Sequence, residues 1–380
     1  MKSTITLIKD EDSVSIKVNV AGVPSGKYAF YLYRNKEKID TIWYSSNSSV
    51  IFNISKTGMY YAMAFVRDDT GSTKSYRSNT VSFLGNTIDI SLDDLFIHKD
   101  ELGSSITRFN VLSGKYKIPC YISLNGLSLH QERKLFVLLS GAAPIGAPTP
   151  LFNRISWESD FPGVVIAIAD PVINEKNLID GVRAGWYIGC SSFDLTSIIA
   201  GLVIKLSNVL NVDLGNVTTY GSSAGGFAAI QIARKVSRKA LAISINPRLD
   251  VFTSNKVMFR NFCKVSFDRQ EPDELRKYYL DRFQVPKNSS EISCRVLLVQ
   301  NINDLDYYNG QFLHYFSKLN VPLINVRKNL SIEQSGLEEL NSHVLALTYE
   351  GPNSHSGEPR ELVSVLLSIA NSIKTHTYAV

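Results

Sequence analysis

The chain has 380 residues, too many for one ordinary core, and its 44% hydrophobic and 20% charged residues are typical of a globular rather than a disordered protein. The net charge of +5 is small and the Lys and Arg residues are scattered, which argues against nucleic-acid binding. No apolar run reaches the ~18 residues of a bilayer span, the amino terminus lacks a secretory pattern, and the four cysteines have no metal-ligand spacing. We therefore expect a cytoplasmic protein with reduced thiols, no metal site and no integral membrane segment.

Residues 1–88 consist of short β-branched and aromatic runs separated by turn residues, as in "KYAFYLYRN" and "MYYAMAFVRD". Runs at spacings of about 8 to 12 residues with turn signals predict a small antiparallel sandwich of the immunoglobulin or fibronectin type. Trp43, Tyr60 and Tyr61 are expected to pack within it. Its role stays open between binding carbohydrate, tethering a partner protein of unknown identity and bracing the lid-like insertion expected at 248–290.

A polar connector is expected at 86–105, and a different rhythm follows over 105–380. Short apolar runs without polar alternation are typical of strands buried on both faces of a parallel sheet. Because helical patterns lie between most of them, we predict a doubly wound, mostly parallel α/β domain. The segment 248–290 interrupts this rhythm and is expected to form a lid-like insertion. The six predicted strands are 134–141, 163–170, 216–223, 240–247, 294–301 and 344–351.

The stretch "TTYGSSAGGFAAIQIARK" (218–235) lies between a predicted strand and a predicted helix, and Gly221-Ser222-Ser223-Ala224-Gly225 matches G-x-S-x-G. In a nucleophile elbow the central serine takes a strained positive φ, so that its hydroxyl projects above the sheet. The flanking glycines avoid collisions with the neighbouring strand and helix. The alternative is a loop that only turns or binds phosphate, although no Lys follows the glycines as in a P-loop. Ser222 is not the candidate nucleophile, because it occupies the x position before the central serine of the motif.

A nucleophilic serine needs a base and an orienting acid, which in this architecture follow in the order Ser, Asp or Glu, His. The loop after the strand 294–301 presents Asp304, with Asp306 as second choice, and helix capping is the alternative role for both. Among the six histidines, only one follows the last predicted strand and precedes the final helix, namely His355; the others are His98, His130, His314, His343 and His376. We therefore expect His355 to be the base.

The oxyanion of the reaction is expected to accept from the backbone N–H of Ala224 and from Gly141 or Ala142, in the loop after the first predicted strand. In 181–194, Trp186 and Tyr187 suit stacking on a sugar, although packing is an equal alternative. In the same segment, Arg183 could hold a carboxylate or phosphate of the substrate. Arg248, just after the predicted strand 240–247, could also contact the substrate, and a surface arginine is its alternative.

With "YGSSAGG", "LLSGAAP", "VQNIND" and "GPNSHSGEP" in these contexts, the chain resembles an α/β-hydrolase-fold serine enzyme. The resemblance implies Ser223 as nucleophile, Asp304 as acid and His355 as base, whereas the H-G-G-G oxyanion motif is replaced by "SGAAP". A sandwich module joined to such a domain also resembles bacterial proteins of surface-polysaccharide biosynthesis, some of which are O-acetyltransferases. This resemblance implies an acetyl ester on a glycan.

The sequence leaves esterase and acyltransferase open, because the triad is common to both. No cofactor is expected, except that a transferase would take its acyl group from a donor such as acetyl-CoA. Two other functions stay open. One is a non-catalytic protein that binds carbohydrate or another partner on a hydrolase scaffold. The other is a peptidase of the same fold, which is less favoured because no peptide-gating region is recognised before the domain.

Overall fold

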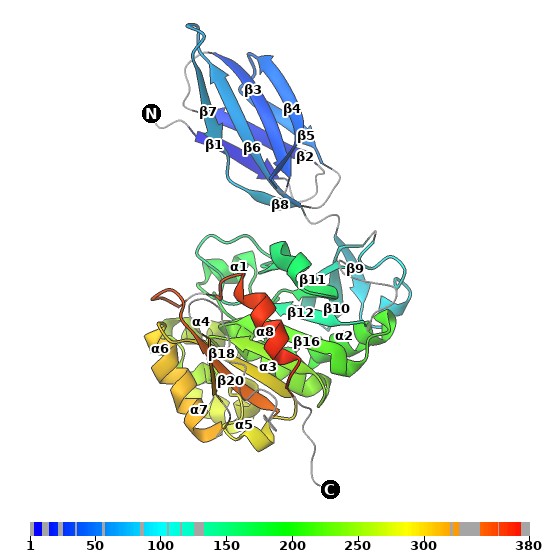
Figure 1. Ribbon diagram of the computed structural model, residues 1–380, viewed down its shortest axis with the longest axis vertical. Coiled ribbons are helices and arrows are strands. Elements are labelled where there is room, and N and C mark those ends of the chain that lie inside the picture. Colours follow the sequence, from blue (N-terminus) through cyan, green and yellow to red (C-terminus); the bar gives the residue numbers. More distant parts are fainter. Residues whose placement is uncertain are drawn as a thin grey trace. The chain divides into compact units, whose positions relative to one another are not determined.

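The computed structural model describes residues 4–9, 15–21, 26–34, 36–54, 58–83, 87–104, 106–114, 116–124, 133–319, 321, 323–326, 343–355 and 357–373. The chain forms two compact units (Figure 1). The first comprises Met1–Thr87 with Ile106–Arg108, and the second comprises Ile88–Ser105 with Phe109–Val380.

The first unit consists of two antiparallel sheets. The three-stranded sheet has the order β1-β2-β5, and the other sheet has the order β4-β3-β6-β7 with β8 paired to β6. The strands are β1 (Thr4–Lys9), β2 (Ser15–Ala21), β3 (Lys27–Arg34), β4 (Glu37–Ser45), β5 (Ser49–Asn53), β6 (Gly58–Arg67), β7 (Thr73–Arg77) and β8 (Val81–Phe83). Neither β1 nor β7 was among the predicted strands.

Buried side chains of both sheets form a single hydrophobic core, to which β2 contributes Val18, β3 contributes Phe30 and β5 contributes Phe52. This arrangement follows from period-two alternation, which sends every second side chain of a strand to the same face. Tyr60 is buried as expected, whereas Trp43 is 69% exposed on β4, so the expectation that it packs inside is wrong.

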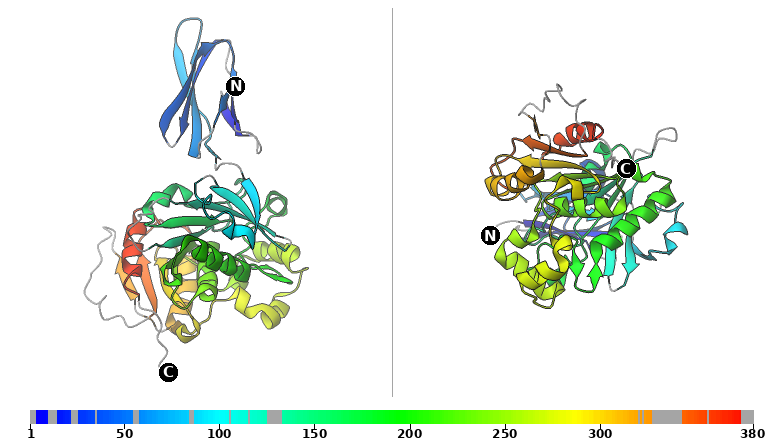
Figure 2. Two further views of the ribbon diagram at one scale, coloured as in Figure 1. Left: turned by 90° about the vertical axis from the view of Figure 1, so that its right-hand side faces the viewer. Right: turned by 90° about the horizontal axis from the view of Figure 1, so that it is seen from below.

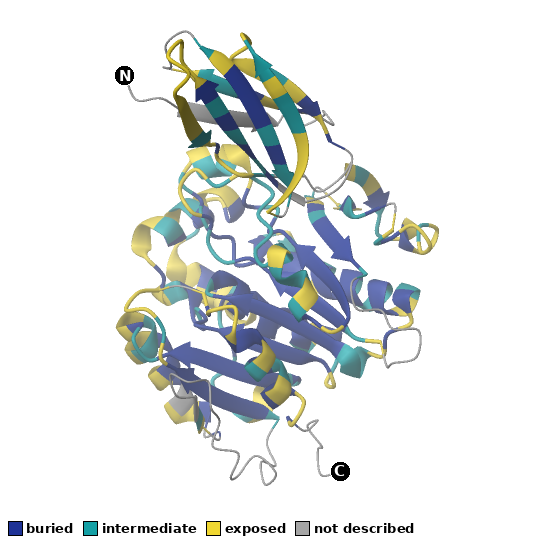
Figure 3. Cartoon of the chain, turned by 45° about the horizontal axis from the view of Figure 1, so that its top comes forward, coloured by how far each residue is buried: buried dark blue, intermediate teal, exposed yellow. Residues whose placement is uncertain are grey.

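The second unit is built on a ten-stranded sheet in the order β19-β20-β18-β17-β16-β12-β13-β11-β10-β9. The strands from β12 to β20 pair in parallel, and β11 pairs antiparallel to β13, which makes the sheet mostly parallel. Central strands are buried on both faces (Figure 3), as continuous apolar runs predict. The strands are β9 (Thr87–Ser91), β10 (Arg108–Ser113), β11 (Tyr116–Ser123), β12 (Leu135–Leu139), β13 (Val164–Ile168), β16 (Val217–Ser222), β17 (Leu241–Ile245), β18 (Arg295–Asn301), β19 (Leu323–Val326) and β20 (Val344–Tyr349).

Helices cover both faces of this sheet, with α2 (Leu195–Leu210) and α3 (Ala224–Val236) on one face and α8 (Leu362–Ala370) on the other (Figure 2). Strand β12 lies between β13 and β16, so the chain reverses its direction of travel across the sheet there. Ligands of open α/β sheets bind outside the carboxyl ends of the strands near such a switch point. The loops after β12 and β16 are therefore the first place to look for a site.

The expectation of a plain connector at 86–105 is wrong, because β9 is the edge strand of the large sheet and the 3-10 turn η1 (Asp94–Phe96) follows it. Strand β9 has only five residues and one fully buried side chain, Ile90, so its sequence carries little apolar signal.

The segment 248–290 contains two helices placed between β17 and β18. In the part of the chain that the structure describes, no helix has the length and apolar character that crossing a membrane requires. The remaining elements are η2 (Ile155–Asp160), α1 (Glu175–Ile179), β14 (Gly189–Cys190), β15 (Phe193–Asp194), η3 (Leu214–Asn216), η4 (Val251–Thr253), α4 (Lys256–Ser266), α5 (Pro272–Phe283), η5 (Ser289–Glu291), α6 (Leu305–Tyr307), the π-helical η6 (Tyr308–Leu313) and α7 (His314–Leu319).

Candidate active site

Ser223 occupies the sharp turn between β16 and α3, with φ of 55° and ψ of −116°. The turn is tight because a Cβ on Gly221 would lie 2.4 Å from the carbonyl oxygen of Gly225, and a Cβ on Gly225 would lie 2.4 Å from that of Leu139. Only glycine fits at these two positions. The N–H of Ser223 donates to the carbonyl of Ile245 at 2.9 Å, which fixes the turn to the neighbouring strand.

Ser223, His355 and Asp304 form a continuous chain of hydrogen bonds. His355 Nε2 lies 2.8 Å from Ser223 Oγ, and His355 Nδ1 lies 2.6 Å from Asp304 Oδ2. Because a carboxylate only accepts, Nδ1 carries the proton and Nε2 is free to accept from the serine hydroxyl. The side chain of Asp304 is 4% exposed and that of His355 is 32% exposed. This is the geometry that general-base activation of a hydroxyl requires.

The alternative residues for these positions lie elsewhere. Asp304 precedes α6 but makes no side-chain cap, and Asp306 is exposed within that helix. The hydroxyl of Ser222 is buried and accepts from Arg154 Nη2 at 2.8 Å, so it is directed away from His355.

The other described histidines contact different partners. His98 lies beside Glu101, His314 beside Lys318, and His343 beside two backbone carbonyls. His130 and His376 lie outside the described residues.

Two asparagine side chains tie the loop that carries Asp304 to the loop that carries His355. Asn301 Oδ1 accepts from the N–H of Gly351 at 2.8 Å, and Asn301 Nδ2 donates to the carbonyl of Pro352 at 2.8 Å. Asn303 Nδ2 donates to the carbonyl of Gly351 at 2.7 Å. These bonds hold the loops after β18 and β20 at a fixed separation.

Two side chains stack in sequence on the imidazole of His355. The ring of Tyr307 is parallel to that of His355, with centroids 3.6 Å apart and an interplanar angle of 16°. The Arg248 guanidinium carbon lies 4.1 Å from the Tyr307 centroid. The backbone N–H of Arg248 donates to the Ser223 carbonyl at 3.3 Å. The structure therefore brings Arg248 to the site, where Tyr307 separates it from the histidine.

The loop after β12 approaches the elbow closely, since a Cβ on Gly141 would lie 3.2 Å from the carbonyl oxygen of Ser222. Its flanking N–H groups are occupied: that of Ser140 donates to Tyr187 Oη at 2.8 Å, and that of Ala143 donates to the Arg183 carbonyl at 2.7 Å. For Gly141 and Ala142, no acceptor is present among the described residues. Ala224 is the first residue of α3, where N–H groups lack intrahelical acceptors.

The aromatic residues proposed to stack on a sugar are buried, with Trp186 3% and Tyr187 0% exposed. Trp186 packs edge-on against Phe262, and Tyr187 Oη donates to the carbonyl of Ile168 at 2.7 Å. Burial raises the pKa of Tyr187, which keeps its hydroxyl protonated. Neither ring presents a free face to a sugar, so the stacking expectation is wrong and the packing alternative accounts for both.

Arg183 is half-buried and braces the same loop. Its Nε donates to the carbonyl of Ala143 at 2.8 Å, and its own carbonyl accepts from the N–H of that residue. The guanidinium is therefore engaged at Nε by the protein itself.

A buried ion pair beneath the elbow was not predicted from the sequence. Arg154 Nε and Nη2 donate to the two carboxylate oxygens of Glu358, each at 2.7 Å, and the two side chains are 6% and 0% exposed. Tyr220 Oη donates to the same carboxylate at 2.6 Å. Burial lowers the pKa of Arg154, but the charge of Glu358 outweighs it and the net pKa is raised. The network joins Ser222, next to the elbow serine, to Glu358, three residues after His355.

No family model and no curated protein matches the chain. Solved structures with a similar fold include the acylaminoacyl peptidase of Pyrococcus horikoshii, at 14% identity and a TM-score of 0.49, covering 98% of this chain and 55% of the peptidase. The acetyl xylan esterase from Paenibacillus sp. R4 has 13% identity and a TM-score of 0.42, covering 82% and 83%. The glycosylation-associated protein complex Gap123 from Streptococcus agalactiae has 11% identity and a TM-score of 0.46, covering 97% and 69%. The chain thus spans about half the length of the peptidase.

Proposed function

We propose that the chain is a serine-dependent enzyme that hydrolyses or transfers acyl esters through Ser223, His355 and Asp304. The observation that carries the proposal is the chain of hydrogen bonds from the elbow hydroxyl through the imidazole to a buried carboxylate, with lengths of 2.8 and 2.6 Å. A positive φ at the serine, which costs of order 1–3 kcal/mol, also supports it, because such strain persists where it positions a reacting group.

In the first step, Ser223 Oγ attacks the ester carbonyl carbon while His355 Nε2 takes the hydroxyl proton. The carboxylate of Asp304 stabilises the imidazolium that forms. The same proton then passes to the leaving group, which is an alcohol oxygen or the sulfur of a thioester donor such as acetyl-CoA, as its bond to the acyl carbon breaks. This leaves an acyl group on Ser223. In the second step, His355 removes a proton from water or from an acceptor hydroxyl, whose oxygen attacks the acyl carbon. The bond to Ser223 Oγ then breaks, and His355 returns the proton to that oxygen.

Negative charge develops on the carbonyl oxygen in both steps and needs donors that are already in position. We assign this role to the N–H of Ala224 and to those of Gly141 and Ala142. The assignment of Gly141 and Ala142 is supported by their neighbours in the loop. The N–H groups of Ser140 and Ala143 already donate to acceptors of the protein, so within the described residues of this loop only the two N–H groups between them are open to an oxyanion. One such donor is worth about 10²–10³ in kcat in a comparable enzyme.

For the substrate, we propose an acetyl or similar acyl ester on a glycan of surface-polysaccharide metabolism, with a donor such as acetyl-CoA if the enzyme is a transferase. Arg248 over Tyr307 offers an aromatic and cationic surface beside the imidazole. The order β1-β2-β5 facing β4-β3-β6-β7 supports an immunoglobulin- or fibronectin-like module at the amino end. In that module, exposed Trp43 lies edge-on to Tyr31, an arrangement suited to recognising sugars.

The test uses two adjacent serines as variant and control. We expect Ser223→Ala to abolish both hydrolysis of p-nitrophenyl acetate and labelling by a fluorophosphonate, whereas Ser222→Ala keeps both, with a lower rate. Mass spectrometry of the protein mixed with acetyl-CoA separates the two reactions: an acetyl group on Ser223 that a sugar removes and water does not indicates transfer. Wild-type protein that neither turns over the ester nor reacts with the fluorophosphonate would support the non-catalytic alternative.

A further inference from the structure

The segment between β17 and β18 encloses a cavity of about 650 Å³ that includes none of the residues assigned to acyl transfer. Its walls come from η4, α4, the turn that follows α4, and the start of α5. The volume lies in the range of small-molecule sites, roughly 300–1,000 Å³.

The floor of the cavity is apolar and held in place by aromatic packing. Phe252 and Phe259 line it together with Cys263. Phe252 stacks on Phe283 with centroids 5.1 Å apart, and Phe259 meets Phe252 edge-on at 5.8 Å. Because these rings support one another, the floor is formed before any ligand arrives. Phe283 stacks on Phe252 and the Arg276 guanidinium carbon also lies over it, 4.2 Å from its centroid, so the floor offers ring edges and suits an apolar ligand body.

Basic side chains surround this floor. Lys256, Arg260 and Lys264 line the cavity at spacings of four residues along α4, so they lie on one face of the helix, and Arg269 joins them from the following turn. All four are exposed, and none has a carboxylate partner within the described residues. Like charges four residues apart destabilise a helix by about 0.2–0.5 kcal/mol per pair. The acidic residue in the lining is Glu271, which leaves a clear excess of positive charge.

Two polar atoms in the lining have no partner in the part of the chain described. Ser254 Oγ and Gln270 Oε1 are both buried without a hydrogen bond, and Ser254 is 9% exposed as a residue. A buried donor or acceptor left unsatisfied costs about 1–3 kcal/mol. A ligand that offers an acceptor oxygen to the Ser254 hydroxyl would remove its share of this cost.

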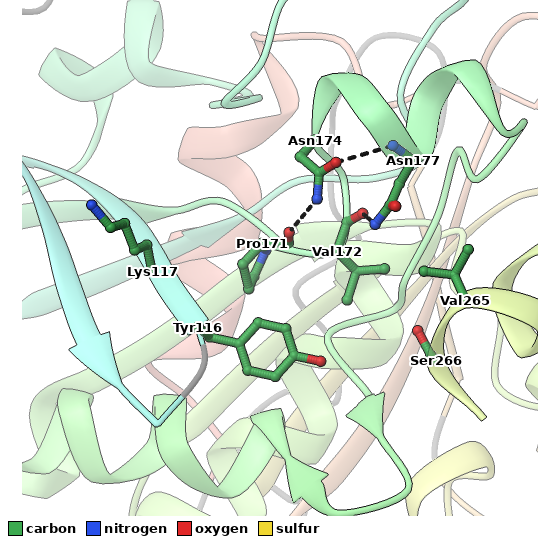
Figure 4. A pocket seen from close by; sticks show the side chains of 8 residues that line it. All are labelled: Tyr116, Lys117, Pro171, Val172, Asn174, Asn177, Val265 and Ser266. Atoms are coloured by element: carbon green, nitrogen blue, oxygen red, sulfur yellow. Dashed lines mark hydrogen bonds between the residues drawn. The ribbon is translucent and has the colours of Figure 1, made fainter. Parts of the chain in front are cut away.

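A second cavity, of about 460 Å³, provides a contrast (Figure 4). Its amide side chains are used by the protein itself: Asn174 Nδ2 donates to the carbonyl of Pro171 at 3.2 Å, and Asn177 Nδ2 donates to that of Val172 at 2.8 Å. Asn174 Oδ1 accepts from the N–H of Asn177. These groups hold the loop after β13, whereas the unpartnered groups of the larger cavity have no such structural use.

We propose that the larger cavity binds an organic phosphate, with an aromatic or alkyl body on Phe252 and Phe259 and the phosphate between the α4 cations and Arg269. A phosphate monoester is preferred to a carboxylate because it carries about −1.5 to −2 charges and three acceptor oxygens, which matches several cations better than a single charge does. Arginine adds a planar fork that binds two phosphate oxygens at once. This site is separate from the acyl-transfer residues, and its occupancy does not depend on their activity.

The experiment is calorimetric titration of the full chain with three probes at fixed salt: 1-naphthyl phosphate, 1-naphthol and inorganic phosphate. We expect the ester to bind about tenfold or more tightly than either fragment, since the cavity holds both parts of it. Removing one charged donor with Arg260→Gln or Lys264→Gln weakens binding of the ester about tenfold. Lys277→Gln is the matched control, because Lys277 is exposed on α5 and does not line the cavity.

Ser223→Ala separates this site from the elbow and is expected to leave the affinity for 1-naphthyl phosphate unchanged. Ser254→Ala weakens it by a few-fold. Thermal unfolding of each variant confirms that it is folded before titration. Wild-type protein that does not bind the ester, equal loss of affinity with Lys277→Gln, or loss with Ser223→Ala would each overturn the proposal.

Discussion

Replacing Glu358 by glutamine tests how strongly the buried ion pair holds the site together. The substitution keeps the size of the side chain but removes its charge, and it leaves the Arg154 guanidinium, 6% exposed, without a counter-charge. Breaking a buried pair by removing one partner costs about 3–5 kcal/mol, which is a large share of the roughly 5–15 kcal/mol that stabilises a typical domain. Tyr220 also loses its charged acceptor. We therefore expect the free energy of unfolding to fall by about 3–5 kcal/mol.

The matched comparison removes both charges. In Arg154→Met with Glu358→Leu, no charge is left buried, and the remaining cost comes from the hydroxyls of Tyr220 and Ser222, which lose their partners. That cost is about 1–3 kcal/mol for each hydroxyl if neither finds a new partner, and less if a water reaches them. The double variant should therefore be more stable than Glu358→Gln alone, because the pair costs more when half of it is removed.

Urea unfolding followed by tryptophan fluorescence measures these values in a Trp43→Phe background. The chain has three tryptophans, and of these only Trp43 lies in the first unit, so the remaining signal comes from Trp157 and Trp186 of the second. Trp157 is a direct reporter, because its ring lies 5.7 Å from the Arg154 guanidinium carbon. A cost below about 1 kcal/mol for Glu358→Gln, or a double variant less stable than the single one, would refute the reasoning.

Three other predictions concern the site and its surroundings. Asp304→Asn should lower ester turnover by about 10⁴ while Asp306→Asn changes it by less than about twofold, and equal effects would contradict the assignment of the acid. Tyr187→Phe removes the hydroxyl between Ser140 and Ile168; it should cost about 1–3 kcal/mol in urea unfolding and lower kcat with KM nearly constant, whereas an unchanged kcat would show that this contact does not position the loop. Burial raises the pKa of Asp170 from 3.8 to about 6, so the folded state holds this proton more tightly than the unfolded state does. The stability that the bound proton contributes is lost as pH rises from about 4 to 6. Relative to Asp170→Asn, the wild type should therefore lose up to about 3 kcal/mol between pH 4 and pH 7, and a pH-independent difference would contradict this.

The elbow could be predicted because all its signals lie within one continuous segment of the chain. An apolar strand, two glycines that only the close approach of backbone explains, and an alanine-rich helix occur between Val217 and Val236. His355 was identified by order along the chain, since it follows the last strand that the sequence predicts and precedes the last helix. Both kinds of evidence, the local residue pattern and the order of elements along the chain, can be read directly from a sequence.

The ion pair could not be predicted because its partners are 204 residues apart and neither belongs to a periodic pattern. Nothing in the residues around Arg154 indicates burial, since a charged residue is normally exposed. Trp186 and Tyr187 were misjudged for the converse reason: residue type suggested stacking on a sugar, but the loop folds inward and buries both rings. The only local signal for Glu358 is its position three residues after the candidate base.

The three side chains proposed to react come from three loops, and the hydrogen bonds that fix these loops are made by other residues. Asn301 and Asn303 join the loop of Asp304 to that of His355, while Arg154 and Glu358 join the loop of His355 to the elbow. Each connection is made in the protein alone, so the separation of the three groups is set before a substrate binds. Such a site needs no substrate binding energy to bring its groups together. Donors that are oriented in advance in this way accelerate a reaction most. It follows that substitutions at Asn301 or Glu358, neither of which is assigned a chemical role, should lower kcat more than they raise KM.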